Sequence, residues 1–160
     1  MGTIFTRWLT IALAALLLQG CGFQLRGTGI PAELMTMKVV GDNKSDFYRL
    51  VTTRLKAGGV QLADKEGIPV LTLGRVGSSS QVASVNALGV DTEYVLGFST
   101  QFTISVPGKP AQVFPINFNR SFLNKPDAAL ASSREQEQLN REMQEQAANQ
   151  VIRQLSQVSF

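Results

Sequence analysis

The sequence offers few residues that could carry out chemistry. Cys21 is the only cysteine among 160 residues, and no histidine occurs anywhere. Histidine is the commonest general base and the commonest metal ligand, so its absence removes most hydrolytic and metal-dependent mechanisms. No Ser-x-x-Lys or Gly-x-Ser-x-Gly motif is present either, although these mark two classes of serine nucleophile. We therefore predict no catalytic residue, no metal site and no cofactor, and we predict that the protein is not an enzyme.

Cys21 follows a short apolar segment. Arg7 opens this segment, and residues 8–18 are apolar apart from one threonine. A basic start followed by a short apolar run is typical of a secretory signal, and the run is too short to span a bilayer. The sequence therefore predicts an exported protein whose mature chain begins near Cys21.

The residues around the cleavage point suggest what happens to the thiol. With Gly20 before Cys21, the segment resembles a bacterial lipobox, which implies diacylation of the thiol, removal of residues 1–20 and acylation of the new amino terminus. Gly22, where an aspartate would hold such a protein back, implies sorting to the outer membrane. The alternative is a plain secreted protein, but a free cysteine at its terminus would be prone to oxidation in that compartment. We predict a lipid anchor at Cys21.

The charge of the chain argues against nucleic-acid binding, and its length argues for a single domain. The chain from Cys21 onward carries 14 basic against 12 acidic side chains, because Arg7 is the only charged residue before it. A balance of +2 is too small for the basic stripe that nucleic-acid binding requires. The 140 remaining residues can form one domain with a real core, and without a second cysteine no disulfide supports it. The sequence predicts a signal peptide at 1–20, a lipidated extended tether at 21–34 and a single domain at 35–160.

Two hydrophobic periodicities place the elements of that domain. Residues 46–57 have apolar side chains at helical spacing, after a Ser45 suited to cap the helix and before two glycines that end it. Alternating apolar and polar residues predict strands near 35–41, 69–85, 94–106 and 114–122, the second of them bent or bulged at its serine run.

A second helix is predicted to run to Leu155. Asp127 or Ser133 would cap it, and an apolar stripe from Leu139 to Leu155 would pack on the sheet. The order β-α-β-β-β-α predicts an α+β two-layer sandwich, with a mixed four-stranded sheet covered on one face by two helices.

Several segments, in this order, resemble the LptE family of outer-membrane lipoproteins that serve lipopolysaccharide transport. They extend over nearly the whole chain after the lipobox, at residues 21–27, 71–76, 92–94, 106–108, 120–122 and 147–155.

The resemblance implies a function and a partner. Members of the family plug the lumen of the LptD β-barrel, assist its assembly and contact lipopolysaccharide, which implies lipid anchoring on the periplasmic side of the outer membrane. A plug in a wet lumen needs polar outer faces, and two of the predicted strands supply them at Gln101, Thr103, Ser105, Asn117 and Asn119. Solvated faces of a free protein would look the same.

Lipopolysaccharide would have to be held by cations, because its phosphates and carboxylates are anionic. Basic residues near predicted turns are the candidates: Arg75, Lys109, Arg120, Lys125 and Arg134. Some relatives carry basic side chains before the third strand and at the start of the last helix, where this chain has Ala87 and Ser132.

Two other functions stay open. The first is a free lipoprotein that binds amphiphiles in a groove between sheet and helix, without a barrel partner. The second is a periplasmic enzyme, for which carboxylates converging in a pocket would be required.

Overall fold

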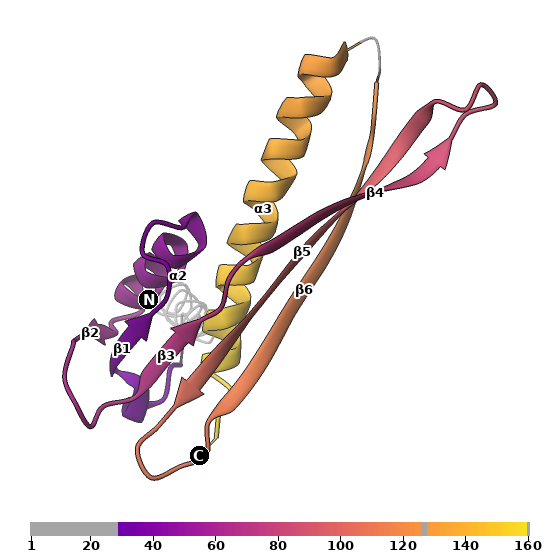
Figure 1. Ribbon diagram of the computed structural model, residues 1–160. Coiled ribbons are helices and arrows are strands. Elements are labelled where there is room, and N and C mark those ends of the chain that lie inside the picture. Colours follow the sequence, from indigo (N-terminus) through magenta and orange to yellow (C-terminus); the bar gives the residue numbers. More distant parts are fainter. Residues whose placement is uncertain (1–28, 126–127, 160) are drawn as a thin grey trace, which may run out of the picture.

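The computed structural model describes residues 29–125 and 128–159 (Figure 1). It has a short 3-10 helix, six strands and two α-helices. In chain order they are η1 (Ala32–Leu34), β1 (Thr36–Val40), α2 (Asp46–Ala57), β2 (Gln61–Leu62), β3 (Val70–Leu73), β4 (Gly77–Val85), β5 (Asp91–Ser105), β6 (Gln112–Leu123) and α3 (Ala129–Leu155). The predicted α+β class is confirmed.

The sheet is mixed, but it has six strands instead of the predicted four. Its order is β2-β1-β3-β5-β4, and β6 pairs with the other side of β5. β1 is parallel to β2 and β3, whereas β3, β4 and β6 are all antiparallel to β5. One extra strand is β2, whose two residues are too few to show an alternating pattern in the sequence.

The other extra strand arises because the predicted second strand is divided. It breaks at residues 74–76, before the serine run, and the serines lie inside β4. A side chain at Gly74 would bring its Cβ within 2.8 Å of the Gln101 carbonyl oxygen. The two halves still follow one another along β5, so the break is a bend in one long path.

α2 forms where the sequence predicts it. The Ser45 hydroxyl accepts a hydrogen bond from the Tyr48 N–H at 3.1 Å, which caps the first turn. Phe47, Val51 and Leu55 are buried on one face. The helix ends before Gly58, and Gly59 has a φ of +85°.

α3 begins earlier than the capping pattern suggests. Its first residue is Ala129, and its N-cap, Ala128, makes no side-chain cap bond. Ser133 is therefore not the cap, because it lies inside the helix and its hydroxyl donates to the Ala129 carbonyl at 3.0 Å. Asp127 lies outside the described residues. The predicted apolar stripe is confirmed, with Met143 to Leu155 carrying its buried members.

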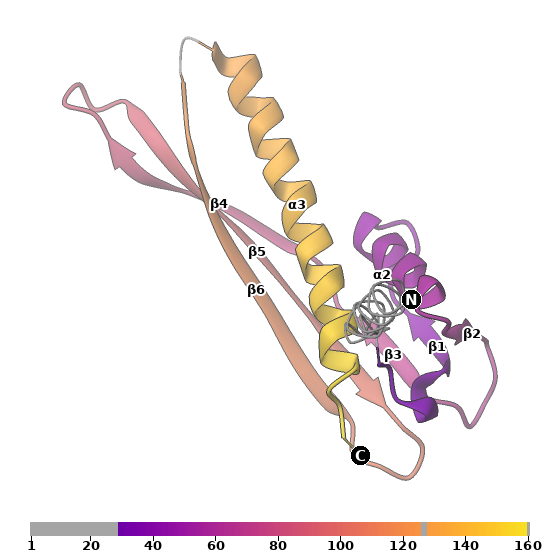
Figure 2. The same cartoon turned by 180° about the vertical axis from the view of Figure 1, so that it is seen from behind.

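Both helices lie on the same side of the sheet and share one core with it (Figure 2). Along β5 the side chains of Leu96, Phe98, Phe102 and Ile104 are buried. Thr100 interrupts this face, and its hydroxyl donates to the Gly74 carbonyl at 3.3 Å.

The packed domain starts before the boundary expected at Met35. Ile30 and Leu34 are buried in the core, and residues 32–34 form η1. These residues are thus not an extended tether, because burial of two large apolar side chains holds them against the domain. No helix within 29–125 and 128–159 is long and apolar enough to cross a membrane.

Candidate functional site

Small polar residues form the central part of the sheet face that points away from the helices. In its centre Gly97 of β5 pairs with Ser79 of β4 and with Asn119 of β6, and the next outward residue, Ser99, pairs with Gly77 and Asn117. These residues line a groove of about 370 Å³. We call this groove the polar trough.

Glycine creates the trough. A Cβ atom at Gly97 would lie 2.4 Å from the Ser79 hydroxyl oxygen and 3.4 Å from the Asn119 side-chain oxygen. A Cβ atom at Gly77 would lie 2.6 Å from the Ser99 hydroxyl oxygen. Side chains at these two positions would fill the space, so the glycines leave hydroxyl and amide groups lining an open groove.

Of the polar outer residues predicted from the sequence, Asn117 and Asn119 line this trough, and Gln101, Thr103 and Ser105 continue the same face along β5. Gln101, Asn117 and Asn119 are exposed, and Thr103 and Ser105 are partly exposed. The alternation pattern therefore identified the correct outer face. It missed Gly77, Ser79 and Gly97, which appeared only as breaks in the pattern.

A second surface is the end of the long β4–β5 hairpin, which projects away from α2 (Figure 1). Its turn is held by Asn86, whose side-chain oxygen accepts hydrogen bonds from Leu88 N–H at 2.9 Å and Val90 N–H at 3.0 Å. Leu88 is 87% exposed. We call residues 82–90 the distal tip, and its exposed large apolar side chains are Val82, Val85, Leu88 and Val90.

The base of the distal tip is tied to β6. Tyr94 stacks on Phe122 with ring centroids 5.6 Å apart, and its hydroxyl donates to the Asp91 carboxylate at 2.9 Å. This hydrogen bond, with smaller contributions from desolvation and from the carboxylate charge, raises the pKa of Tyr94. The ring pair and the hydrogen bond fix where the hairpin leaves the domain.

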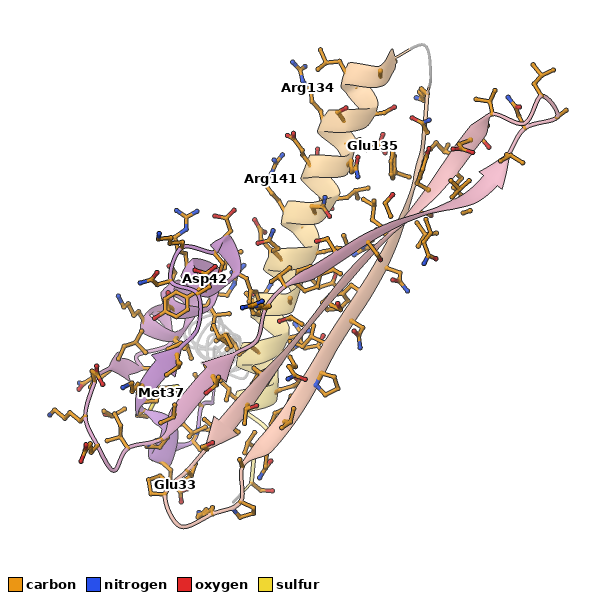
Figure 3. The ribbon with its side chains drawn as sticks, in the orientation of Figure 1. Glu33, Met37, Asp42, Arg134, Glu135 and Arg141 are labelled. Carbon is orange, nitrogen blue, oxygen red and sulfur yellow. The ribbon has the colours of Figure 1, made fainter. Side chains whose placement is uncertain are left out.

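The structure does not gather the five predicted cations into one site. Lys109 lies at the opposite end from the distal tip, where its ammonium contacts Glu33 at 3.2 Å, and Arg134 lies near the start of α3 (Figure 3). Arg75 is exposed in the β3–β4 bend.

The other two cations lie on the β6 side. Arg120 donates to the side-chain oxygen of Gln146 at 3.0 Å, and Lys125 follows the end of β6. Arg134 lies twelve residues before Gln146 on α3, which is about 18 Å along the helix. In Figure 3 the Arg134 side chain projects from the side of α3 that faces away from β6, so only Arg120 and Lys125 lie together on the β6 side.

Ser132, where some relatives are basic, has a structural contact in this chain. It is 8% exposed, and its hydroxyl accepts a hydrogen bond from the Lys125 N–H at 3.1 Å. The bond joins the end of β6 to the first turn of α3. Ala87, the other such position, is exposed in the turn of the distal tip.

We expect Ser132→Ala to lower the free energy of unfolding by about 1–2 kcal/mol, because it leaves a backbone N–H without its partner. Urea denaturation followed by circular dichroism measures this change. Ser133→Ala is the matched control, because that hydroxyl is exposed and bonds only its own helix; we expect about 0.5 kcal/mol or less. Equal losses in the two variants would contradict the structural role of Ser132.

A groove of about 660 Å³ lies between the two helices. Leu50 and Thr53 of α2 line it, and its rim carries Arg49, Arg54 and Arg141 together with Asp46 and Glu145. Asp46 already forms an ion pair with Arg49. The groove is between helices and not between sheet and helix as the amphiphile hypothesis expects.

No group of three or more potential metal ligands occurs in the part of the chain that the structure describes. The predicted lipidation site, Cys21, lies outside that part.

Known proteins resemble this chain along most of its length. The family model LptE, described as lipopolysaccharide-assembly, matches residues 34–155. The LPS-assembly lipoprotein LptE of Pectobacterium atrosepticum is 34% identical over 155 residues, which cover 92% of this chain and 83% of the relative. The protein of the same name from Yersinia pestis is 34% identical over 152 residues, which cover 92% and 73%.

Two solved structures share the fold. Rare lipoprotein B from Shewanella oneidensis superposes with a TM-score of 0.72 at 33% identity, over 76% of this chain and 94% of that one. An uncharacterized lipoprotein B from Nitrosomonas europaea superposes with a TM-score of 0.71 over 84% and 90%, and at 19% identity it supports the fold alone.

Proposed function

The chain belongs to the LptE family of lipopolysaccharide-assembly lipoproteins, and we propose that it plugs the lumen of an LptD-type β-barrel in the outer membrane. Together the two proteins would insert lipopolysaccharide into the outer leaflet. The family consists of lipopolysaccharide-assembly lipoproteins and not of enzymes.

The polar trough is the observation that carries this proposal. A wall that lines a water-filled lumen offers hydrogen-bonding groups, so a plug must present hydroxyls and amides over a broad face. The trough does this across three strands, and α2 and α3 both lie on the other side of the sheet. A face of this kind can also exchange direct contacts for bridging waters without losing complementarity.

Anchoring follows from the lipobox. Acyl chains on Cys21 would hold the mature chain on the periplasmic side of the outer membrane, after removal of residues 1–20. Since Ile30 is already packed into the core, the free tether would span the residues before it. Such a short link would keep the domain close to the membrane and raise the effective concentration of the barrel.

Contacts with lipopolysaccharide are proposed for the five exposed or half-exposed cations. Arg120 and Lys125 are favoured because Arg120 lies on β6 and Lys125 follows its end. Arg75 is exposed beside the sheet, and Lys109 would have to exchange its contact with Glu33 for a phosphate.

A pull-down tests the barrel partner. The lipidated protein is extracted in mild detergent and its co-purifying proteins are identified by mass spectrometry. We expect a stable complex with one much larger β-barrel protein. Recovery of the lipoprotein alone would overturn the proposal.

We expect Asn119→Lys to lower recovery of that complex about tenfold or more, because it places an unpaired charge in the trough and such a buried charge costs 2–5 kcal/mol. The stability of the free domain should change by less than about 0.5 kcal/mol, since Asn119 is exposed. Gln61→Lys, the same kind of change on the distant strand β2, is the control and should leave recovery unchanged. Loss of the complex in both variants would remove the trough from the interface.

The interhelical groove supports a second candidate function, that of a free amphiphile-binding lipoprotein. Its apolar floor and three guanidinium groups would suit an anionic head group with an acyl chain. This candidate predicts lipid bound to the isolated domain, lost in Arg141→Ala, and no barrel in the pull-down.

A further inference from the structure

The outer edge of β4 is a long sheet edge without the usual protection against pairing. Within the described residues β4 pairs only with β5, and its nine residues include neither a charge nor a proline. β6, the other long edge, carries Pro115 and Arg120, and the edge strand β2 has only two residues. Charges, prolines and short strands are the devices that normally prevent strand addition at an edge.

The position beside β4 is the continuation of the one that β1 occupies. β3 and β4 follow one another along β5, and β1 covers only the first of them, with Val40 opposite Thr72 as the last pair. The chain then turns away at Gly41. In Figures 1 and 2 nothing among the labelled elements lies along β4 on the side away from β5. One more strand would therefore complete the sheet there.

The shape of β4 also favours an added strand. All nine of its residues are exposed, including those on the face that the helices cover elsewhere in the sheet. From Gly77 to Val82 its register against β5 is regular, and the irregularities begin only after Val82. A regular edge of six residues offers about six outward N–H and C=O groups, because in an antiparallel pair alternate residues direct both groups outward. Small hydroxyl side chains leave those groups accessible.

We propose that the β4 edge from Gly77 to Val82 binds an extended segment of the partner barrel protein by β-strand addition. This inference rests on the proposed function, because it assigns a contact to that partner. The segment would be uncharged and about six residues long, with an apolar side chain that covers the exposed Val82.

A partner segment suits the edge better than a second copy of this chain. Two β4 edges would bring together mostly serine side chains and would bury little apolar surface. A partner that already contacts the polar trough adds the remaining interface, since Gly77 and Ser79 belong to both the trough and the edge. Main-chain hydrogen bonds would then supply affinity, as in other strand-addition complexes.

Residue-resolved hydrogen–deuterium exchange on the full lipidated chain, free and in its detergent-extracted complex, tests this proposal. We expect complex formation to slow exchange about a hundredfold at alternate amides between Gly77 and Val82, because only outward N–H groups gain a partner. Amides of the β6 edge are the internal control, and complex formation should not slow their exchange at alternate residues.

The outcomes separate this inference from the proposed function. Isolation of the complex with unchanged β4 exchange overturns strand addition alone. Failure to isolate the complex overturns both. Protection of β4 in the free protein overturns the partner assignment: dependence on protein concentration would assign the edge to a second copy, and independence would assign it to another part of this chain.

A proline pair gives a second test. Ser79 and Ser80 are neighbours, so one N–H points toward β5 and the other toward the free edge. We expect one of Ser79→Pro and Ser80→Pro to destabilise the free domain, and the other to leave its melting temperature unchanged while complex recovery falls about tenfold. A folded variant with full recovery in each case would overturn the proposal. If neither variant folds, the exchange measurement decides.

Discussion

Replacement of Cys21 by alanine will abolish incorporation of labelled palmitate and leave a precursor that retains residues 1–20. The thiol is the only group in the chain that can accept the thioether-linked lipid, since no other cysteine exists. Each buried methylene contributes about 0.8 kcal/mol, so an acyl chain with a dozen of them contributes about 10 kcal/mol to membrane binding. With two or more chains, attachment becomes effectively permanent.

A second variant tests lipidation without blocking export. If residues 1–21 are exchanged for a secretory signal that is cut without lipidation, the mature domain should appear in the soluble periplasmic fraction of cells that overproduce it beyond its partner. Gly22→Asp is the matched control, because it keeps the lipid and should change only the membrane in which the protein is found. Membrane attachment of the unlipidated domain in such cells would contradict the anchor at Cys21.

Local sequence patterns predicted those elements whose stability is local. α2 carries its own cap at Ser45 and its own stop at Gly58, so its bounds follow from neighbours in sequence. The predicted cap at Ser133 was wrong because the start of α3 does not follow from its local sequence. A serine three residues from a carboxylate or amide has capping-box spacing. The helix nevertheless begins at Ala129, its first turn is joined to the end of β6 through Ser132, and Ser133 lies inside it.

Strand pairing was harder to predict because its determinants are distant in sequence. The bend at residues 74–76 depends on the close approach of Gly74 to Gln101, and alternation along one strand does not report such a contact. β2 exists only because Gln61 pairs with Thr36 of β1.

The sequence predicted the outer face of the candidate site but not the trough within it. Alternation along β5 and β6 showed which side chains point outward, and the structure confirms that face. The trough itself needs Gly77, Gly97 and Asn117 from three strands to lie side by side, and only the register of the sheet specifies this. The cations were named by charge and turn context alone, which does not fix distances between them.

Phe102→Ala is expected to cause the largest loss of stability, about 3–5 kcal/mol. Phe102 is fully buried in β5, and its ring stacks on Phe114 of β6 with centroids 4.9 Å apart. It also pairs in register with Leu73 of β3. Removal of the ring would leave a cavity where three strands meet, and cavities in a packed core relax only partly. Domains of this size have a total stability of about 5–15 kcal/mol.

Urea denaturation of the unlipidated mature domain gives this value directly. Leu123→Ala, which removes an apolar side chain that is 61% exposed on β6, is the control and should cost about 0.5 kcal/mol or less. The double variant Phe102→Ala/Phe114→Ala should lose less than the sum of the two single changes, by about 0.5–1.5 kcal/mol for the stacked pair. Equal losses for Phe102→Ala and Leu123→Ala would contradict the core described here.

The same variant also distinguishes folding from binding. Gln101 and Thr103 flank Phe102 on β5 and point to the outer face, so loosening β5 from within should disorder the polar trough as well. Phe102→Ala should therefore lower both stability and complex recovery, whereas Asn119→Lys should lower recovery alone. If complex recovery survives a loss of several kcal/mol in Phe102→Ala, the trough cannot depend on the register of β5, and the interface would have to lie elsewhere on the domain.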